Sequence, residues 1–218
     1  DHIADLERST FRSMRMAAAF SHIMDIDDGM DALEKYVEEI ENCSEFYLCL
    51  YSDWDTLSDP VLTLAASEDM DGFSSAVPSN TMLLKLGMKN GRRLPECSFQ
   101  KNSLLPEFLE NSSDASYIVS PLFFEDRSFG YIAMAFEKNK LNYPFKLVPF
   151  IMNITQLLSN LCDTKRTRLL TEHLETLYLR DVLTGLYNHH GFDQQKDQLL
   201  KNLAHYRYIS ALIFDLDM

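Results

Sequence analysis

The fold is decided by one stretch, Tyr117-Ile-Val-Ser-Pro-Leu-Phe-Phe124, which runs through Glu125-Asp-Arg-Ser128 into Phe129-Gly-Tyr-Ile-Ala-Met-Ala-Phe136. Two apolar runs flank a short polar turn, and this pattern predicts a β-hairpin. The second run alternates small and large apolar residues, as expected of a strand that is covered on at least one face. An antiparallel sheet is therefore the predicted centre of the domain.

Helices are predicted before this sheet. Apolar residues recur at helical spacing over residues 3–24 and again over Met30–Glu41, and Asp25-Ile-Asp-Asp-Gly29 supplies a turn and a cap between them. From Glu45 the period changes to two, which indicates strands. The expected strands are Phe46–Tyr51 and Val61–Ala65; Thr81–Met88 suits a strand or a short helix, and Asn90-Gly91 suits a turn.

A long helix is predicted after the hairpin, from about Pro144 to Leu179. Its first apolar stripe has spacings of four, three and four residues and consists of Phe150, Ile154, Leu157 and Leu161. A polar stretch, Cys162–Arg168, separates this stripe from a second one out of heptad register with it. That change indicates either a stutter in a coiled coil or a helix that changes packing partners. We expect the first stripe to join two copies of the chain.

Composition limits the possible partners. The chain has 218 residues, of which 46% are hydrophobic and 24% charged, as in a soluble globular protein. Thirty-three acidic residues against 20 basic ones give a net charge of −13, which argues against binding to nucleic acid or anionic lipid. No apolar run approaches the roughly 20 residues that span a bilayer. Four scattered cysteines indicate reduced thiols in the cytoplasm.

The most specific pattern lies in the last forty residues. Tyr178-Leu-Arg-Asp-Val-Leu-Thr-Gly-Leu-Tyr-Asn188 precedes His189-His-Gly-Phe192, an amphipathic helix and Ile209-Ser-Ala-Leu-Ile-Phe-Asp-Leu-Asp217. Asp and Thr suit a tight turn, Gly allows an unusual dihedral angle, and Asn is a good helix cap. The last run predicts a buried strand that ends in two carboxylates, which suit a hard cation such as Mg²⁺.

This pattern resembles the opening of a GGDEF domain, the diguanylate cyclase family, over about residues 178–218. The resemblance implies that the parent protein condenses two GTP molecules into cyclic di-GMP across a dimer. It implies a Mg²⁺ site in which Asp215 binds the metal, Leu216 lends its backbone carbonyl, and Asp217 is an acidic position that follows. The motif at the entry to the domain corresponds to Asp181, Leu183, Thr184, Gly185 and Asn188.

Two features depart from the family pattern. His189 and His190 stand where family members usually carry arginines, and the signature loop of the family would lie beyond Met218. The chain begins with Asp1 and stops straight after a strand-like run, so we expect it to be a piece of a longer cytoplasmic protein. We therefore expect this piece to have no catalytic residues and no cyclase activity of its own.

The region before the long helix resembles a GAF domain in its helices, its central antiparallel sheet and its late hairpin. The resemblance implies a regulatory pocket on one face of the sheet for a small molecule. The candidate lining residues are Tyr47, Cys49, Tyr51, Trp54, Tyr117 and Phe123. Aromatic residues at strand spacing also suit plain core packing, and both interpretations stay open.

The predicted fold class is α+β: a GAF-like antiparallel sheet flanked by helices, then a long linker helix and a truncated α/β GGDEF start. The expected parts are a signalling helix (1–24), a sensor domain (25–143), a helical stalk (144–179) and the start of a GGDEF domain (180–218). The predicted function is the signal-transduction region of a homodimeric diguanylate cyclase. The alternative is a non-catalytic ligand-binding or dimerisation module with a degenerate GGDEF domain.

Overall fold

The computed structural model describes residues 2–55, 79–110, 117–125, 127–136, 147–181 and 183–201. It divides into two compact units, Asp1–Thr167 and Arg168–Met218. The elements are α1 (His2–Phe20), α2 (Ile26–Glu38), β1 (Cys43–Tyr51), β2 (Thr81–Lys89), β3 (Arg92–Leu94), β4 (Cys97–Gln100), α4 (Glu107–Glu110), β5 (Tyr117–Phe124), β6 (Arg127–Phe136), α5 (Leu147–Leu179) and α6 (His189–Lys201). The helix α5 begins in the first unit and ends in the second.

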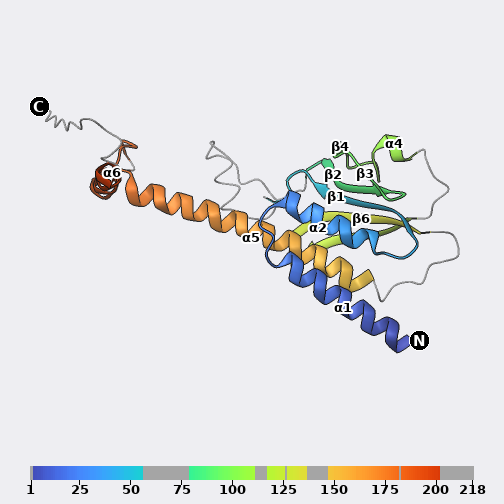
Figure 1. Ribbon diagram of the computed structural model, residues 1–218. Coiled ribbons are helices and arrows are strands. Elements are labelled where there is room, and N and C mark those ends of the chain that lie inside the picture. The colour runs from blue at the N-terminus through green and yellow to red at the C-terminus, as the bar shows by residue number, and fades with distance from the viewer. Residues whose placement is uncertain are drawn as a thin grey trace, which may run out of the picture. The chain divides into compact units, whose positions relative to one another are not determined.

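The first unit is an α+β domain around a six-stranded antiparallel sheet, as predicted (Figure 1). Its strand order is β3-β2-β1-β6-β5, and β4 also pairs with β2. The predicted hairpin is β5–β6, with Tyr117 opposite Ala135. The segment Thr81–Lys89 is a strand along its whole length, paired with β1, so the helical alternative for it was wrong.

One glycine is required where β6 crosses β1. Gly130 has a φ of +141°, and a Cβ atom there would lie 2.1 Å from the carbonyl oxygen of Cys49. A side chain at this position would therefore collide with the backbone of the neighbouring strand.

The main core lies between one face of the sheet and the helices α1, α2 and the first half of α5. The side chains of Phe46, Leu48 and Leu50 on β1 belong to this core. The ring of Phe46 meets that of Phe150 on α5 edge to face, with centroids 6.0 Å apart. Aromatic pairs in this arrangement stabilise a core beyond their buried area. This face of the sheet is therefore closed by packing within the chain.

The packing of α5 corrects the expectation for its first apolar stripe. Phe150, Ile154, Leu157 and Leu161 are 7%, 0%, 0% and 6% exposed and lie in the core of their own chain. They do not face outward, so they cannot join two copies. The distal part of the same helix behaves differently, since Leu174 is 64% exposed.

Two helix boundaries differ from the prediction. The helix α2 begins at Ile26, four residues early, because the side chain of Asp25 caps it by accepting a 2.8 Å hydrogen bond from the backbone N–H of Asp27. The helix α1 ends at Phe20, and its Met16 and Phe20 are buried in the core of the first unit. The expected strand Val61–Ala65 lies outside the described residues.

Candidate functional site

The second face of the sheet, away from α1, α2 and α5, carries the candidate site. Successive residues of a strand point to opposite faces, so Glu45, Tyr47 and Cys49 alternate with the core residues of β1. Tyr47 and Cys49 are fully buried in a separate cluster, which Leu105 and Leu109 join from the segment that contains α4. The buried members of this cluster are Tyr47, Cys49, Met82, Leu84, Leu105, Leu109 and Ala133.

A buried carboxylate is the chemical centre of this face. The strand register places Tyr117, Ala135, Glu45 and Lys89 in one row across β5, β6, β1 and β2. Because Ala135 is small, the Tyr117 side chain reaches across it. The Oε2 atom of Glu45 accepts hydrogen bonds from the hydroxyls of Tyr117 at 2.5 Å and Tyr47 at 2.8 Å, and Lys89 Nζ lies 3.1 Å from Oε1.

These contacts keep Glu45 ionised although the residue is only 5% exposed. Burial by itself raises the pKa of Glu45, but the hydrogen bonds from Tyr117 and Tyr47 and the nearby Lys89 ammonium outweigh burial and lower it. Burial and the adjacent carboxylate raise the pKa of Tyr47, which therefore keeps its proton. The arrangement is a buried carboxylate that is paired with the Lys89 ammonium and accepts hydrogen bonds from two tyrosine hydroxyls.

Cys49 on this face is fully buried. Burial raises the pKa of Cys49 to about 12, so the reactive thiolate is scarce at neutral pH. Next to it, the Tyr131 hydroxyl donates a 2.5 Å hydrogen bond to the carbonyl oxygen of Leu104. This bond ties the segment before α4 to the sheet and so helps to cover the face.

The structure brings four of the six predicted pocket residues together and separates two. Tyr47, Cys49, Tyr51 and Tyr117 share the second face. Trp54 instead lies in the main core, with its ring centroid 6.4 Å from that of Phe129. Phe123 is 63% exposed. Trp54 was therefore a wrong candidate for the lining, and Phe123 is not among the residues buried on this face.

Glu45, Lys89 and Tyr131 were not among the residues predicted for the site. A signal for the first existed, since Glu45 stands two residues before Tyr47 in a run that otherwise consists of apolar and aromatic residues. A charged residue on the same face as a buried tyrosine indicates a buried polar pair. Lys89 and Tyr131 join the group only through strand pairing, which no local pattern reveals.

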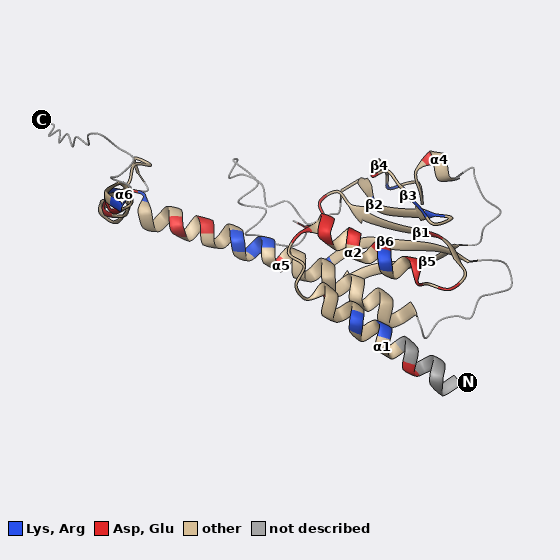
Figure 2. Cartoon of the chain, viewed as in Figure 1, with Lys and Arg blue, Asp and Glu red and all other residues tan. Residues whose placement is uncertain are grey.

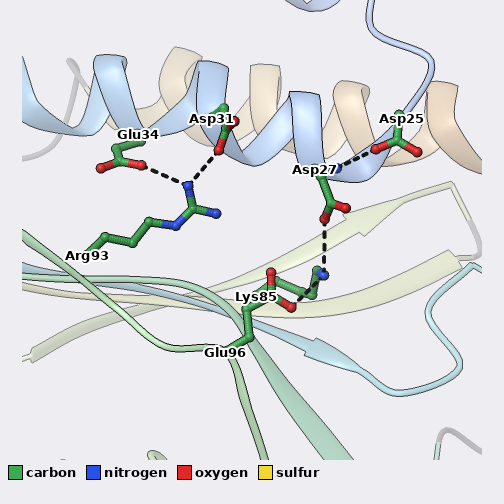
Figure 3. Close-up of polar contacts among 7 residues, drawn as sticks. All are labelled: Asp25, Asp27, Asp31, Glu34, Lys85, Arg93 and Glu96. Atoms are coloured by element: carbon green, nitrogen blue, oxygen red, sulfur yellow. Dashed lines mark hydrogen bonds and ion pairs between the residues drawn. The ribbon is translucent and has the colours of Figure 1, made fainter.

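A second polar cluster attaches α2 to the edge of the sheet (Figure 3). Arg93 NH1 lies 2.6 Å from an oxygen of Asp31 and 3.0 Å from one of Glu34. Lys85 Nζ lies 2.7 Å from Glu96 and 3.8 Å from Asp27. Four acidic groups thus share two cations, which leaves a net charge of −2, and these ion pairs attach α2 to the sheet.

In the second unit, the predicted entry motif forms a tight turn. Asp181 Oδ1 accepts hydrogen bonds from the backbone N–H of Thr184 at 2.9 Å and from its hydroxyl at 2.8 Å. These bonds lower the pKa of Asp181. Gly185 has a φ of +69°, in agreement with the unusual dihedral angle predicted for the glycine of this turn. Leu183 is 92% exposed and takes no part in packing within the described residues.

Asn188 joins this turn to the helices on both sides. Its Nδ2 atom donates a 2.8 Å hydrogen bond to the carbonyl of Tyr178, and its Oδ1 atom accepts one of 3.0 Å from the N–H of Gly191. The second bond caps α6, as predicted. His190 stacks on the ring of Tyr178 with centroids 5.0 Å apart, and His189 lies 3.3 Å from Asp193.

The predictions about a metal site and about membrane spans can be compared with the described residues alone. Asp215 and Leu216, the predicted Mg²⁺ ligands, lie outside the described residues. Within the described ranges, no three His, Cys, Asp or Glu side chains are grouped to hold a metal ion. None of the described helices combines the length and apolar character needed to cross a bilayer. No protein-family model, curated protein or solved structure matched the chain in comparisons with known proteins.

Proposed function

We propose that this chain is the cytoplasmic regulatory region of a diguanylate cyclase, in which a GAF-like sensor domain precedes the start of a GGDEF domain. The observation that carries the proposal is the turn over 181–188. Asp181, Thr184, Gly185 and Asn188 each have a distinct role in its geometry. Residues that each have a defined role in one turn between two helices are more typical of the entry to a second domain than of an irregular linker.

The proposed sensor site is the face around Glu45. A small molecule with a polar or cationic group would compete for the carboxylate, which now accepts from two tyrosine hydroxyls and faces one ammonium group. Binding would move β1, and β1 also carries Phe46, which packs on Phe150 of α5. The signal would then pass along α5 and change how two GTP-loaded domains meet in the dimer.

In the parent enzyme, Asp215 and the carbonyl of Leu216 would hold Mg²⁺, which supplies the positive charge that stabilises the transferring phosphates. This assignment rests on the resemblance of Phe214-Asp-Leu-Asp217 to the family pattern. It is the part of the proposal that is easiest to test by substitution.

The test is cyclic di-GMP formation by the full-length parent protein from GTP and Mg²⁺, followed by chromatography. We expect Asp215→Asn to abolish the product. Asp193→Asn is the matched control, because Asp193 is a partly exposed carboxylate on α6 paired with Lys196 and lies outside the proposed site. A parent gene that encodes no Gly-Gly-acid-acid-Phe turn or near variant after residue 218 would sink the cyclase assignment.

The sensor assignment has its own test. Thermal-shift screening of the 218-residue chain with metabolites identifies a ligand, because binding to the native state raises the melting temperature by mass action. Glu45→Gln removes the fixed charge, so it should abolish the shift caused by a cationic ligand. A ligand that binds in the absence of any cyclase activity in the parent would favour the degenerate GGDEF alternative.

A further inference from the structure

Charged side chains surround the point at which α5 leaves the main core. Cys162 is the last residue of this helix in that core and is 5% exposed. From Leu147 to Cys162 the sequence of α5 contains no Asp, Glu, Lys or Arg, and Figure 2 draws this part of the helix in tan. Asp163 is the first charged residue of α5, and it belongs to the polar stretch that separates the two apolar stripes of the helix. The attachment of α5 to the first unit therefore changes from apolar to charged after Cys162.

Two ion pairs join this polar stretch to the ends of two strands. Asp163 Oδ1 lies 2.9 Å from NH1 of Arg127, which is the first residue of β6. Lys165 Nζ lies 2.5 Å from Oδ2 of Asp55, which belongs to the turn after β1. We call these four side chains and the thiol of Cys162 the exit cluster.

The four charges lie around the thiol of Cys162. Its Sγ atom donates a 3.7 Å hydrogen bond to the carbonyl oxygen of Trp54, in the same turn as Asp55. Burial raises the pKa of the Cys162 thiol to about 12. The two cations of the exit cluster lower this pKa and its two carboxylates raise it, so all four charges act on one sulfur atom. The exit cluster is therefore one connected group and not two separate ion pairs.

The exit cluster is a weak attachment that follows a strong one. In the first half of α5, Phe150, Ile154 and Leu157 are at most 7% exposed, so releasing them would open the main core. The ion-pair side chains of the exit cluster are 20–58% exposed. Ion pairs with this exposure are weak, and each favours the closed arrangement by a factor of about 2–5. The end of the attached helix can therefore open while the core before it stays packed.

We propose that the exit cluster is an ionic latch that determines where the attachment of α5 to the first unit ends. With the latch closed, the helix is held as far as Lys165; with the latch open, it is held as far as Leu161, about one turn earlier. The latch responds to the sheet, because Asp55 follows β1, Arg127 begins β6, and the end of β1 pairs with the start of β6. A small shift between these two strands would change both ion-pair distances. The role of the latch in signalling rests on the proposed function, in which α5 leads to the cyclase domain.

The test is the alkylation of Cys162 by iodoacetamide in the folded 218-residue chain, followed over hours by peptide mass spectrometry. Arg127→Gln and Lys165→Gln each remove one ion pair and should raise the rate at Cys162 about two- to fivefold in dilute salt. The loss of a cation by itself raises the pKa of the thiol and slows alkylation, so a faster reaction reports opening and not a change in acidity. In 1 M NaCl, screening should open the latch in the original chain and remove most of the difference.

Arg93→Gln is the matched control, because Arg93 forms the same kind of ion pairs with two acids of α2, outside the exit cluster. It lowers the stability of the whole unit, so it should leave the rate at Cys162 unchanged and raise only that at Cys49, which is fully buried within the sheet. The reversed pair Arg127→Asp with Asp163→Arg should restore slow alkylation. Unchanged rates at Cys162 in both latch variants overturn the proposal, and so does a rate that Arg93→Gln raises as much as Arg127→Gln does. The experiment needs no cyclase activity, so its failure leaves the cyclic di-GMP test untouched.

Discussion

Replacing Tyr117 by Phe tests the buried carboxylate directly. The change removes one hydroxyl that donates to Glu45 and leaves the ring, which packs near Tyr47 with centroids 6.2 Å apart. Lys89 still neutralises the carboxylate and Tyr47 still donates a hydrogen bond to it, so the buried charge keeps two partners. The loss is that of one hydrogen bond to a buried charged group, which is about 2 kcal/mol at neutral pH. For a chain of this length the melting temperature should fall by about 4–8 °C.

The loss should depend on pH in a defined direction. The folded state lowers the pKa of Glu45 below the ordinary value of 4.5, so the stabilisation is fully present above that pH. It disappears as the pH falls through the lowered folded value, where the carboxyl group becomes protonated. A neutral hydrogen bond then remains, worth about 1 kcal/mol. The difference between the original chain and Tyr117→Phe should therefore halve on going from pH 7 to strongly acidic solution.

The assay is urea unfolding followed by the fluorescence of Trp54. This residue is the single tryptophan of the chain and is 8% exposed, so its emission reports exposure of the main core. Tyr131→Phe is the control, because the Tyr131 hydroxyl donates to a neutral backbone carbonyl. It should cost about 1 kcal/mol without the acid-dependent change. A cost below about 0.5 kcal/mol for Tyr117→Phe, or an equal cost at both pH values, would refute the reasoning.

Four further predictions concern the backbone, an ion pair and two thiols. Gly130→Ala should prevent folding, measured as loss of soluble protein, because the new Cβ would lie 2.1 Å from a backbone oxygen of β1. In contrast, Gly29→Ala should raise the free energy of unfolding by about 0.5–1 kcal/mol, because alanine has the higher helix propensity. The new Cβ at position 29 would meet a side chain of α5 at 3.4 Å, which is an ordinary van der Waals contact. Arg93→Gln should cost about 0.5–1 kcal/mol in dilute salt and much less in 1 M NaCl, because screening weakens its pairs with two acids of α2. Cys49 and Cys162, whose pKa values burial raises to about 12, should stay unlabelled by Ellman's reagent until the chain is unfolded; rapid labelling of both thiols in the native chain would contradict their burial.

Local sequence patterns predicted the helices and strands better than they predicted which elements these pack against. The β5–β6 hairpin was predictable because both strands and the turn lie within 20 residues. Thr81–Lys89 stayed ambiguous because its apolar residues suit both periods, and only its pairing with β1 makes it a strand. The stripe that contains Phe150 and Leu157 was predicted to join two copies of the chain, and it is instead buried in the core of its own chain. The spacing of this stripe does not distinguish packing against the same chain from packing against a second chain, because both kinds of helix packing have the same repeat of apolar residues.

The two pocket candidates that do not line the site fail for identifiable reasons. Trp54 lies in the main core together with Leu48 and Leu50, from which it is separated by even numbers of residues, so the alternation of β1 assigns it to the main core and not to the second face. Phe123 stands between Leu122 and Phe124, which both pack in the main core, so it faces the other side of the sheet, but it is 63% exposed near the end of β5. Counting by twos therefore predicts which face a residue is on, but not whether another element covers it.

The position of β1 explains how one strand serves both the proposed site and the helices. It is flanked on both sides by other strands, so it has no free edge along which to adjust. One residue step separates Glu45, which faces the candidate site, from Phe46, which packs on Phe150 of α5. Close-packed interiors have little free volume, so a displacement at the first residue has to be taken up at the second. Signal transfer in the proposed sensor therefore needs no long pathway, because the site and the start of α5 lie on opposite faces of the same strand.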